Sequence, residues 1–244
     1  MPHPPRLLVS VRNAEEAGIA AAAGADLIDF KEPLQGSLGM VEPATLRESV
    51  ACLRQQFPEC VISAACGEVL DWDGIAAGVL PAVQYLKLGL AGLASHSDWK
   101  VRWTKVRRTL SAGVEGSESP SWIAVAYVDN ELAQSPPVEE VIAAAFETGC
   151  VGMLFDTCSK GEGRLLDYLS EERLISLTAE IQQLGLLVAA AGRLSIDDVS
   201  RVCQTGVDII AIRSAACLDG DRGGSISSEA IERFRTAMEC LVER

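Results

Sequence analysis

The chain has 244 residues, of which 48% are hydrophobic and 23% charged, the composition of a globular protein with ample apolar material for a core. This length suits a single α/β barrel and does not require a second domain. The formal net charge of -13 argues against nucleic acid as a partner, because an acidic surface repels a phosphate backbone. A small phosphate-bearing ligand would have to be held by local cations and backbone N–H groups.

Cysteine and histidine usage argues against a metal site. The chain has eight cysteines and two histidines, with no Cys-x-x-Cys pair and no closely spaced set of ligands. Several cysteines, such as Cys66, lie inside apolar runs, which is typical of small buried side chains. No stretch is long and apolar enough to predict a signal peptide or a membrane span, so we expect a cytoplasmic protein without membrane contact.

Strands and helices alternate through the first half of the sequence. The expected strands are continuous apolar runs, as in a parallel sheet covered on both faces. Asn13 suits a helix N-cap, and Gly24 suits the position after a helix end. In chain order we expect a strand at Arg6–Val11, a helix from Asn13 to Ala23, a strand at Asp26–Phe30, a helix at Pro43–Gln56, a strand at Cys60–Cys66, a short helix around Trp72–Gly78, a strand at Val83–Gly89 and a helix from Ser97 to Ala112.

The same alternation continues after a polar loop at Gly113–Pro120. Gly149 and Gly206 each end a predicted helix and precede a strand, as Gly24 does. In chain order we expect a strand at Trp122–Val128, a helix from Pro137 to Gly149, a strand at Val151–Phe155, a helix at Ser170–Leu184, a strand at Leu186–Ala191, a helix from Ser195 to Cys203, a strand at Val207–Arg213 and a last helix at Glu229–Glu243.

Eight strand–helix units in about 240 residues predict a single (β/α)8 TIM barrel, with residues 1–244 as one α/β domain. An open doubly wound sheet is the alternative. The turn after the first strand, Val9–Glu15, lacks the Gly-x-Gly-x-x-Gly pattern that such sheets use to bind dinucleotides. The barrel is therefore the preferred prediction.

Two lysines stand out near the predicted C-terminal ends of strands, where barrels carry their functional side chains. Lys31 follows Asp29 by two residues, so both point the same way from the strand. Lys87 lies within the apolar run Tyr85–Leu90, where its ammonium group must find a partner or lose its proton. A lysine that burial keeps neutral can attack a carbonyl group and form a Schiff base.

Further polar residues at the predicted strand ends are candidates for proton transfer and substrate binding. Asp29 and Asp156 would move protons or orient the lysines, with an ion-pair or helix-cap role as the alternative. A phosphate would sit after strands seven and eight, where Gly192 allows close approach of the backbone and a short helix follows Arg213. The candidate substrate-binding residues are Lys160, Tyr127, Asp129, Gly192, Arg193, Arg213, Ser214 and Arg222.

With these residues placed, the sequence resembles the (5-formylfuran-3-yl)methyl phosphate synthase family over nearly its whole length. The most specific match is Asp29-x-Lys31-x-Pro33-x-x-Gly36-Ser-Leu-Gly39, which fixes a charged pair relative to a glycine loop. Further matches are Lys87-x-Gly89-Leu, Ala126-Tyr-x-Asp129, Asp156-Thr157 with Lys160, Ala191-Gly192, Arg213-x-Ala-Ala-Cys217 and Gly220-Asp-Arg222. The chain departs from the family pattern at Glu32, Arg193, Ser214 and Gly161-Glu162, beside the expected phosphate contacts.

The resemblance implies a lyase of methanofuran-type cofactor synthesis, within one-carbon metabolism. Such an enzyme joins two molecules of glyceraldehyde 3-phosphate and releases phosphate and water. By the same resemblance Lys31 would form the Schiff base and Lys87 would be the general acid and base. Asp29, Asp156 and Lys160 would surround the reacting carbons, and neither a metal nor an organic cofactor would be needed.

Two other functions remain open on the residues alone. A class I Schiff-base aldolase acting on another phosphosugar has the same residue types. A non-catalytic barrel that binds a phosphate-bearing ligand is disfavoured by the two strand-end lysines, because phosphate sites usually prefer arginine forks and backbone N–H groups. The expected partners are triose phosphates and a second copy of the chain. The basic run from Lys100 to Arg108 is interpreted as a solvated helix face, with an oligomer contact as the alternative.

Overall fold

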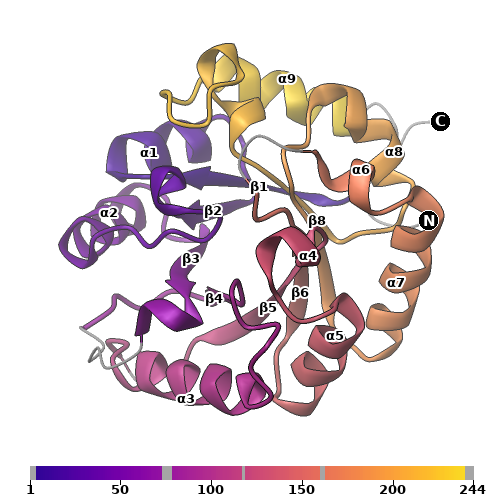
Figure 1. The fold of residues 1–244 in the computed structure, drawn as a ribbon. Coiled ribbons are helices and arrows are strands. Elements are labelled where there is room, and N and C mark those ends of the chain that lie inside the picture. Colours follow the sequence, from indigo (N-terminus) through magenta and orange to yellow (C-terminus); the bar gives the residue numbers. More distant parts are fainter. Residues whose placement is uncertain (1–3, 73–78, 117–118, 160–162, 240–244) are drawn as a thin grey trace.

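Eight parallel strands close into a barrel in the computed structural model of this protein, which describes residues 4–72, 79–116, 119–159 and 163–239. Each strand pairs with the strands before and after it in sequence, and β8 closes the barrel against β1. Figure 1 shows the strands at the centre and the helices around them. The predicted (β/α)8 barrel is therefore confirmed.

The strands are short and apolar, and alternate residues point into the barrel or toward the helices. On β5, Ile123, Val125 and Tyr127 belong to one buried cluster, whereas Trp122 and Ala124 belong to the other and larger one. The strands are β1 (Arg6–Val11), β2 (Leu27–Phe30), β3 (Val61–Glu68), β4 (Tyr85–Gly89), β5 (Ser121–Tyr127), β6 (Gly152–Asp156), β7 (Leu187–Ala190) and β8 (Ile209–Ile212).

The helices pack their apolar sides against the outside of the barrel. They are α1 (Ala14–Ala22), α2 (Pro43–Gln56), α3 (Trp99–Ala112), α4 (Asn130–Ala133), α5 (Val138–Glu147), α6 (Leu165–Tyr168), α7 (Glu171–Gln183), α8 (Val199–Cys203) and α9 (Ser228–Glu239). Short 3₁₀ turns occur at Pro33–Gln35, Val69–Trp72, Ile196–Asp198, Ser214–Ala216 and Leu218–Gly220.

The start of α1 follows from local chemistry visible in the sequence. The Asn13 side chain accepts a hydrogen bond from the backbone N–H of Glu16 (3.0 Å), as predicted for a helix cap. Gly24 follows the helix with a φ of 89°, a conformation that disfavours any residue with a Cβ. Most of the short helix expected around Trp72–Gly78 lies outside the described residues, after the 3₁₀ turn at Val69–Trp72.

The third strand is longer than predicted, and this matters for the barrel mouth. β3 continues past Cys66 to Glu68, because a register shift between Ala65 and Glu68 lets the strand pair further along β4. Such irregularities are common next to active sites, where they redirect a side chain.

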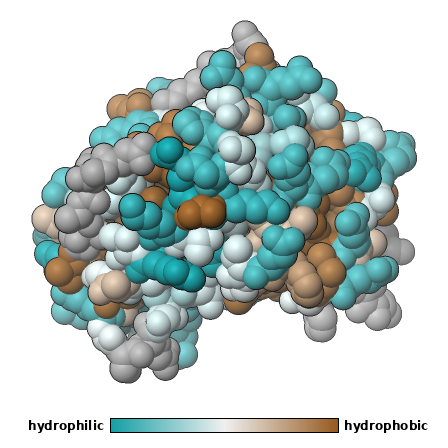
Figure 2. Space-filling view, turned by 60° about the horizontal axis from the view of Figure 1, so that its bottom comes forward, coloured by the Kyte–Doolittle hydropathy of each residue, from teal (hydrophilic) through white to brown (hydrophobic). Residues whose placement is uncertain are grey.

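The outer surface is mixed, with polar residues covering most of the face in Figure 2 and apolar residues in small groups. No helix in the described ranges has the length and apolarity needed to cross a lipid bilayer.

Candidate active site

Strand register gathers polar side chains at one end of the barrel. Asp29 on β2 lies opposite Ser10 on β1 and Ser63 on β3. Tyr127 on β5 lies opposite Asp156 on β6. All five side chains are buried, and the last two end their strands. The C-terminal end of the barrel is therefore a polar mouth, as the sequence predicts.

A buried ion pair forms the floor of this mouth. Lys87 Nζ lies 2.5 Å from Asp29 Oδ1, with 5% and 1% of the two side chains exposed. Ser63 Oγ donates to Asp29 Oδ1 (2.6 Å), and Ser10 Oγ donates to Asp29 Oδ2 (3.2 Å). Burial acts to raise the pKa of Asp29, but the positive charges of Lys87 and Lys31 outweigh it and lower this pKa below its usual value. A lysine within an apolar strand is expected to need a partner for its ammonium group, and for Lys87 this partner is Asp29.

Lys31 differs from Lys87 in that its amine has no salt-bridge partner among the described residues. It follows β2 directly, and its backbone N–H donates to Val11 O (2.9 Å). Its side chain is half-buried, and within the described residues no carboxylate forms a salt bridge with it. Burial lowers the pKa of Lys31, and the opposing charges of Asp156 and Asp29 do not restore it. A lowered pKa increases the fraction of the amine that is neutral at a given pH.

Asp156 faces the same space as Lys31. It is 5% exposed at the end of β6, and its Oδ1 accepts the backbone N–H of Thr157 (2.8 Å). Burial raises its pKa above the usual value although the charge of Lys31 opposes this. A carboxyl group whose pKa is raised keeps its proton to higher pH than a free one and suits general acid–base work.

A small cleft of about 40 Å³ joins Lys31 and Asp156 to the loops after β7 and β8. Its lining includes all the candidate phosphate-binding residues that the sequence places on those two loops: Gly192, Arg193, Arg213 and Ser214, together with Arg222. None of the hydrogen bonds among the described residues uses the backbone N–H of Gly192, Arg193 or Ser214. These N–H groups are free to bind an anion.

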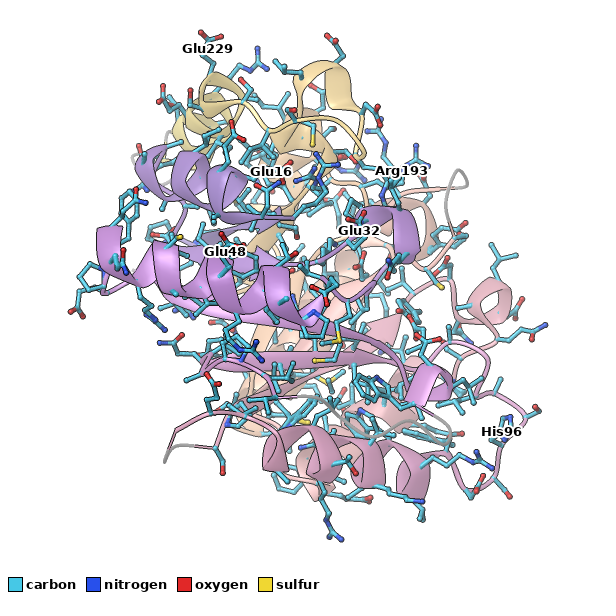
Figure 3. All side chains as sticks on the ribbon, turned by 90° about the vertical axis from the view of Figure 1, so that its left-hand side faces the viewer. Glu16, Glu32, Glu48, His96, Arg193 and Glu229 are labelled. Atoms are coloured by element: carbon cyan, nitrogen blue, oxygen red, sulfur yellow. The ribbon has the colours of Figure 1, made fainter. Side chains whose placement is uncertain are left out.

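The Gly192 loop depends on the absence of a side chain. Gly192 has a φ of 102°, and a Cβ there would lie 3.2 Å from Thr157 Cγ2 and 3.3 Å from the backbone N of Leu165. Arg193 adopts a left-handed φ of 55° and is exposed. Figure 3 shows Arg193 and Glu32 toward the same end of the molecule, with His96 well away from both.

Arg222 reaches the cleft from the loop that precedes α9. Its Nη2 donates to Gly36 O (3.2 Å), and its Nε is buried without a hydrogen-bond partner in the described structure. Burial lowers its pKa, and Asp156 contributes a neighbouring negative charge. An unpaired guanidinium N–H beside a cleft is a suitable donor for a phosphate oxygen.

Arg213 is used differently from the sequence-based expectation. Its guanidinium forms a salt bridge with Glu16 (Nη1–Oε2 2.5 Å) and also donates to the carbonyl oxygens of Ser10, Arg222 and Gly224. With a further bond from Nη2 to Glu16 Oε1 (3.2 Å), all five N–H donors are occupied. In this conformation the side chain holds the loops together and offers no donor to a substrate.

Asp129 likewise uses its side chain for hydrogen bonds within the protein. Its Oδ1 accepts the backbone N–H of Cys158 (2.8 Å), and its Oδ2 accepts the backbone N–H and the hydroxyl of Ser159 (2.8 and 2.5 Å). It therefore shapes the loop that follows β6. Lys160, the next residue on that loop and another predicted contact, lies outside the described residues.

Sequence reasoning missed Glu68 as a mouth residue. Tyr127 donates its hydroxyl hydrogen to Glu68 Oε1 at 2.5 Å, which links the ends of β5 and β3. Burial raises the pKa of Glu68. The predicted strand ended at Cys66 and so excluded Glu68, which the register shift on β3 brings to the mouth. Ser10 and Ser63 were missed because single serines in apolar strands carry no signal.

No group of three or more His, Cys, Asp and Glu side chains in the described ranges is arranged to hold a metal ion. None of the seven cysteines in these ranges forms a disulfide bond with another of them.

Comparison with known proteins identifies the family. Residues 7–235 match the family described as 4-HFC-P synthase. The chain belongs to this family. A (5-formylfuran-3-yl)methyl phosphate synthase from Methanopyrus kandleri is 34% identical over 241 residues, covering 96% of this chain and 99% of the relative. One from Methanosarcina mazei is 32% identical over 234 residues, covering 94% and 97%. The 4-HFC-P synthase family resemblance seen in the sequence is confirmed, and a synthase is an enzyme.

Solved structures support the fold of this 4-HFC-P synthase family member. Phosphoribosyl anthranilate isomerase from Thermus thermophilus has a TM-score of 0.60 at 14% identity, covering 97% of this chain and 99% of its own. KGPDC from Streptococcus mutans has a TM-score of 0.58 at 14% identity, covering 98% and 99%. At this level of identity the likeness concerns the fold alone.

Proposed function

We propose that the protein is a lyase that condenses two molecules of glyceraldehyde 3-phosphate into (5-formylfuran-3-yl)methyl phosphate through a lysine Schiff base. One phosphate and two water molecules leave, and the product serves methanofuran-type cofactor synthesis. Family membership and the names of the relatives support this product. The observation that carries the chemistry is the contrast between a Lys31 amine on the cleft, without a salt-bridge partner among the described residues, and a Lys87 amine paired with Asp29.

Lys31 is the proposed nucleophile. Its lowered pKa increases the neutral fraction of the amine, and the neutral amine adds to the aldehyde carbon of the first triose. Loss of water then gives an imine on Lys31. The protonated imine withdraws electrons from the neighbouring carbon, which loses a proton to give an enamine. The enamine carbon attacks the aldehyde of the second triose.

Lys87 and Asp29 act together in the proton transfers. The buried pair keeps a proton-carrying group at the floor of the mouth, and in the proposed reaction the carbon that must lose its hydrogen lies above it. The two serines hold the Asp29 carboxylate in place, so that its charge stays aimed at Lys87. Asp156, with its raised pKa, is the proposed acid for departure of hydroxide as water.

One phosphate group occupies the cleft beside the β7 and β8 loops. The free backbone N–H groups of Gly192, Arg193 and Ser214 and the unpaired Nε of Arg222 are its proposed donors. Arg213 contributes by holding these loops in place. In a chain with a net charge of -13, such local donors are the means of binding a phosphate.

Borohydride trapping tests the proposal. The protein is incubated with glyceraldehyde 3-phosphate, reduced, digested and mapped by mass spectrometry, and an unreduced sample is assayed for the furan phosphate. We expect an adduct on Lys31 and a furan product. Lys31→Ala should abolish the adduct, whereas Lys87→Ala should slow turnover but still allow trapping. Lys105→Ala, an exposed lysine on α3, is the matched control and should behave as wild type.

The outcomes separate the remaining alternatives. An adduct on Lys31 without furan would indicate an aldolase with another partner. No adduct on any lysine would favour a barrel that only binds a phosphate-bearing ligand. If Lys31→Ala traps as much substrate as wild type, the role given to Lys31 is wrong. The predicted cytoplasmic location and self-association are separate proposals, tested by fractionation and by light scattering.

A further inference from the structure

Glu68 is held at the barrel mouth by several independent contacts. Its Oε2 accepts the backbone N–H of Ala91 (2.8 Å), and its own backbone N–H donates to Asp71 Oδ2 (2.7 Å). Its Oε1 accepts the hydroxyl hydrogen of Tyr127 at 2.5 Å. Both carboxylate oxygens therefore have a fixed donor, which leaves the side chain little freedom.

The backbone around Glu68 is arranged to place this carboxylate. Gly67 has a φ of 76°, in the left-handed region, and its N–H donates to Leu38 O (2.8 Å). Gly89 lies opposite Glu68 in the β3–β4 register, and a Cβ at Gly89 would collide with the Glu68 carboxylate. Gly89 thus leaves the space that the Glu68 carboxylate occupies, and Gly67 leaves the space for the Asp71 carboxylate that accepts the Glu68 backbone N–H.

Tyr127 connects Glu68 to the reaction site. Its side chain points into the barrel, is 1% exposed, and lies opposite Asp156 in the β5–β6 register. The negative charge of Asp156 is also felt at the Tyr127 hydroxyl, where it adds to the effect of burial in raising the pKa of the phenol. The phenol hydrogen points to Glu68, so the phenol oxygen has only lone pairs to offer a ligand.

We propose that Glu68 is a positioning residue that fixes Tyr127 as a hydrogen-bond acceptor for a hydroxyl group of the triose phosphate. This inference rests on the proposed function. Phosphate and carbonyl oxygens cannot donate a hydrogen bond, so they are not partners for an acceptor phenol. Glyceraldehyde 3-phosphate has a single hydroxyl, on C2, and this is the group that Tyr127 binds.

Replacement of Glu68 by glutamine should reverse the direction of this hydrogen bond. One carboxylate oxygen becomes an NH₂ group. The Ala91 backbone N–H can only donate, so the amide oxygen must stay opposite it. The NH₂ group then faces Tyr127 and donates to the phenol oxygen, and the phenol hydrogen turns toward the ligand. Glu68→Gln therefore converts the Tyr127 phenol from a hydrogen-bond acceptor toward the ligand into a donor, with little change in the shape of the site.

The test compares glyceraldehyde 3-phosphate with 3-oxopropyl phosphate, which lacks the C2 hydroxyl. Borohydride trapping on Lys31 is measured against concentration for both aldehydes with the full-length wild type, Glu68→Gln, Tyr127→Phe and the double variant. Wild type should trap the hydroxylated aldehyde at a concentration lower by a factor of roughly ten, the worth of one hydrogen bond. Tyr127→Phe should trap both aldehydes alike. Because a hydroxyl also accepts hydrogen bonds, Glu68→Gln is assayed with 2-fluoro-3-oxopropyl phosphate as well, whose C2 fluorine cannot donate. Relative to 3-oxopropyl phosphate, wild type should disfavour the fluorinated aldehyde, Glu68→Gln should not, and the double variant should behave as Tyr127→Phe.

Several outcomes would overturn the proposal. If Glu68→Gln disfavours the fluorinated aldehyde as much as wild type does, or if Glu68→Gln still changes selectivity when Tyr127 is phenylalanine, then Glu68 does not act through Tyr127. If Glu68→Gln does not fold, Tyr127→Phe is used in its place, and wild-type selectivity in that variant would overturn the proposal. Absence of adduct in wild type would overturn the proposed function itself, and this inference with it. Glu140→Gln, an exposed change on α5, is the matched control.

Discussion

Replacement of Asp29 by asparagine should destabilise the barrel because it leaves Lys87 buried without a counter-ion. Lys87 is 5% exposed, and Asp29 is its salt-bridge partner among the described residues. Breaking a buried pair by removing one member costs about 3–5 kcal/mol. For a chain of this size each kcal/mol lowers Tm by about 2–4 °C, so the expected decrease is about 6–20 °C at neutral pH.

Thermal unfolding followed by circular dichroism measures this effect, with a double variant as the critical comparison. Asp29→Asn combined with Lys87→Met removes both charges, and most of the lost Tm should return because no charge is left unpaired. The contribution of Asp29 also depends on pH in a defined direction. Because the folded pKa of Asp29 is lowered, its stabilisation is complete above the unfolded value of about 3.9 and is lost as pH falls through the folded pKa. A Tm for Asp29→Asn within 2 °C of wild type, a bound taken from the same scaling, would refute the ion pair.

Three further changes test other parts of the mouth. Lys31→Met should raise Tm at neutral pH while abolishing borohydride trapping, because the lowered pKa means that the folded protein disfavours the charged amine. Asp156→Asn should also raise Tm at pH 7, and this gain should disappear below about pH 4, because a raised pKa makes the ionised carboxylate destabilising as pH rises through it. Gly192→Ala should lower the free energy of unfolding by about 1–3 kcal/mol, since a residue with a side chain is strained at φ 102° and its Cβ would press on Thr157. It should also raise KM, because the loop is a proposed phosphate site. An unchanged KM in steady-state assays would show that this loop does not bind the phosphate.

Sequence patterns predicted the barrel because its signals are local and repeated. Apolar runs, the Asn13 cap and the glycines after helices each depend on neighbouring residues only. The same reasoning placed Lys31 and Asp29 on one face, and the structure has both at the mouth. The predicted end of the third strand, Cys66, was two residues short, because a change of register like that in β3 has no local sequence signal.

Partners across the barrel could not be predicted, because they depend on which strands meet and at what register. Nothing near Arg213 in sequence indicates that Glu16, on α1, occupies its guanidinium. A strand-end arginine therefore looked like a phosphate ligand. Tyr127 was assigned to substrate binding, but its link to Glu68 across two strands had no sequence signal.

Charged groups near the mouth fall into two kinds, which differ in the direction of their pKa shift and in whether they have a salt-bridge partner. Asp29 and Glu16 each have a salt-bridge partner and a pKa below the usual value, so their ionised forms stabilise the fold at neutral pH. Lys31, Asp156 and Glu68 are shifted toward their neutral forms, mainly by burial, and their ionised forms cost the fold stability. A protein keeps such a cost where the groups are needed for function. The Glu16–Arg213 pair thus holds the loops together, and the Asp29–Lys87 pair combines a structural role with the proposed proton transfers. Of the shifted groups, Lys31 and Asp156 line the cleft, whereas Glu68 has a fixed donor on each carboxylate oxygen.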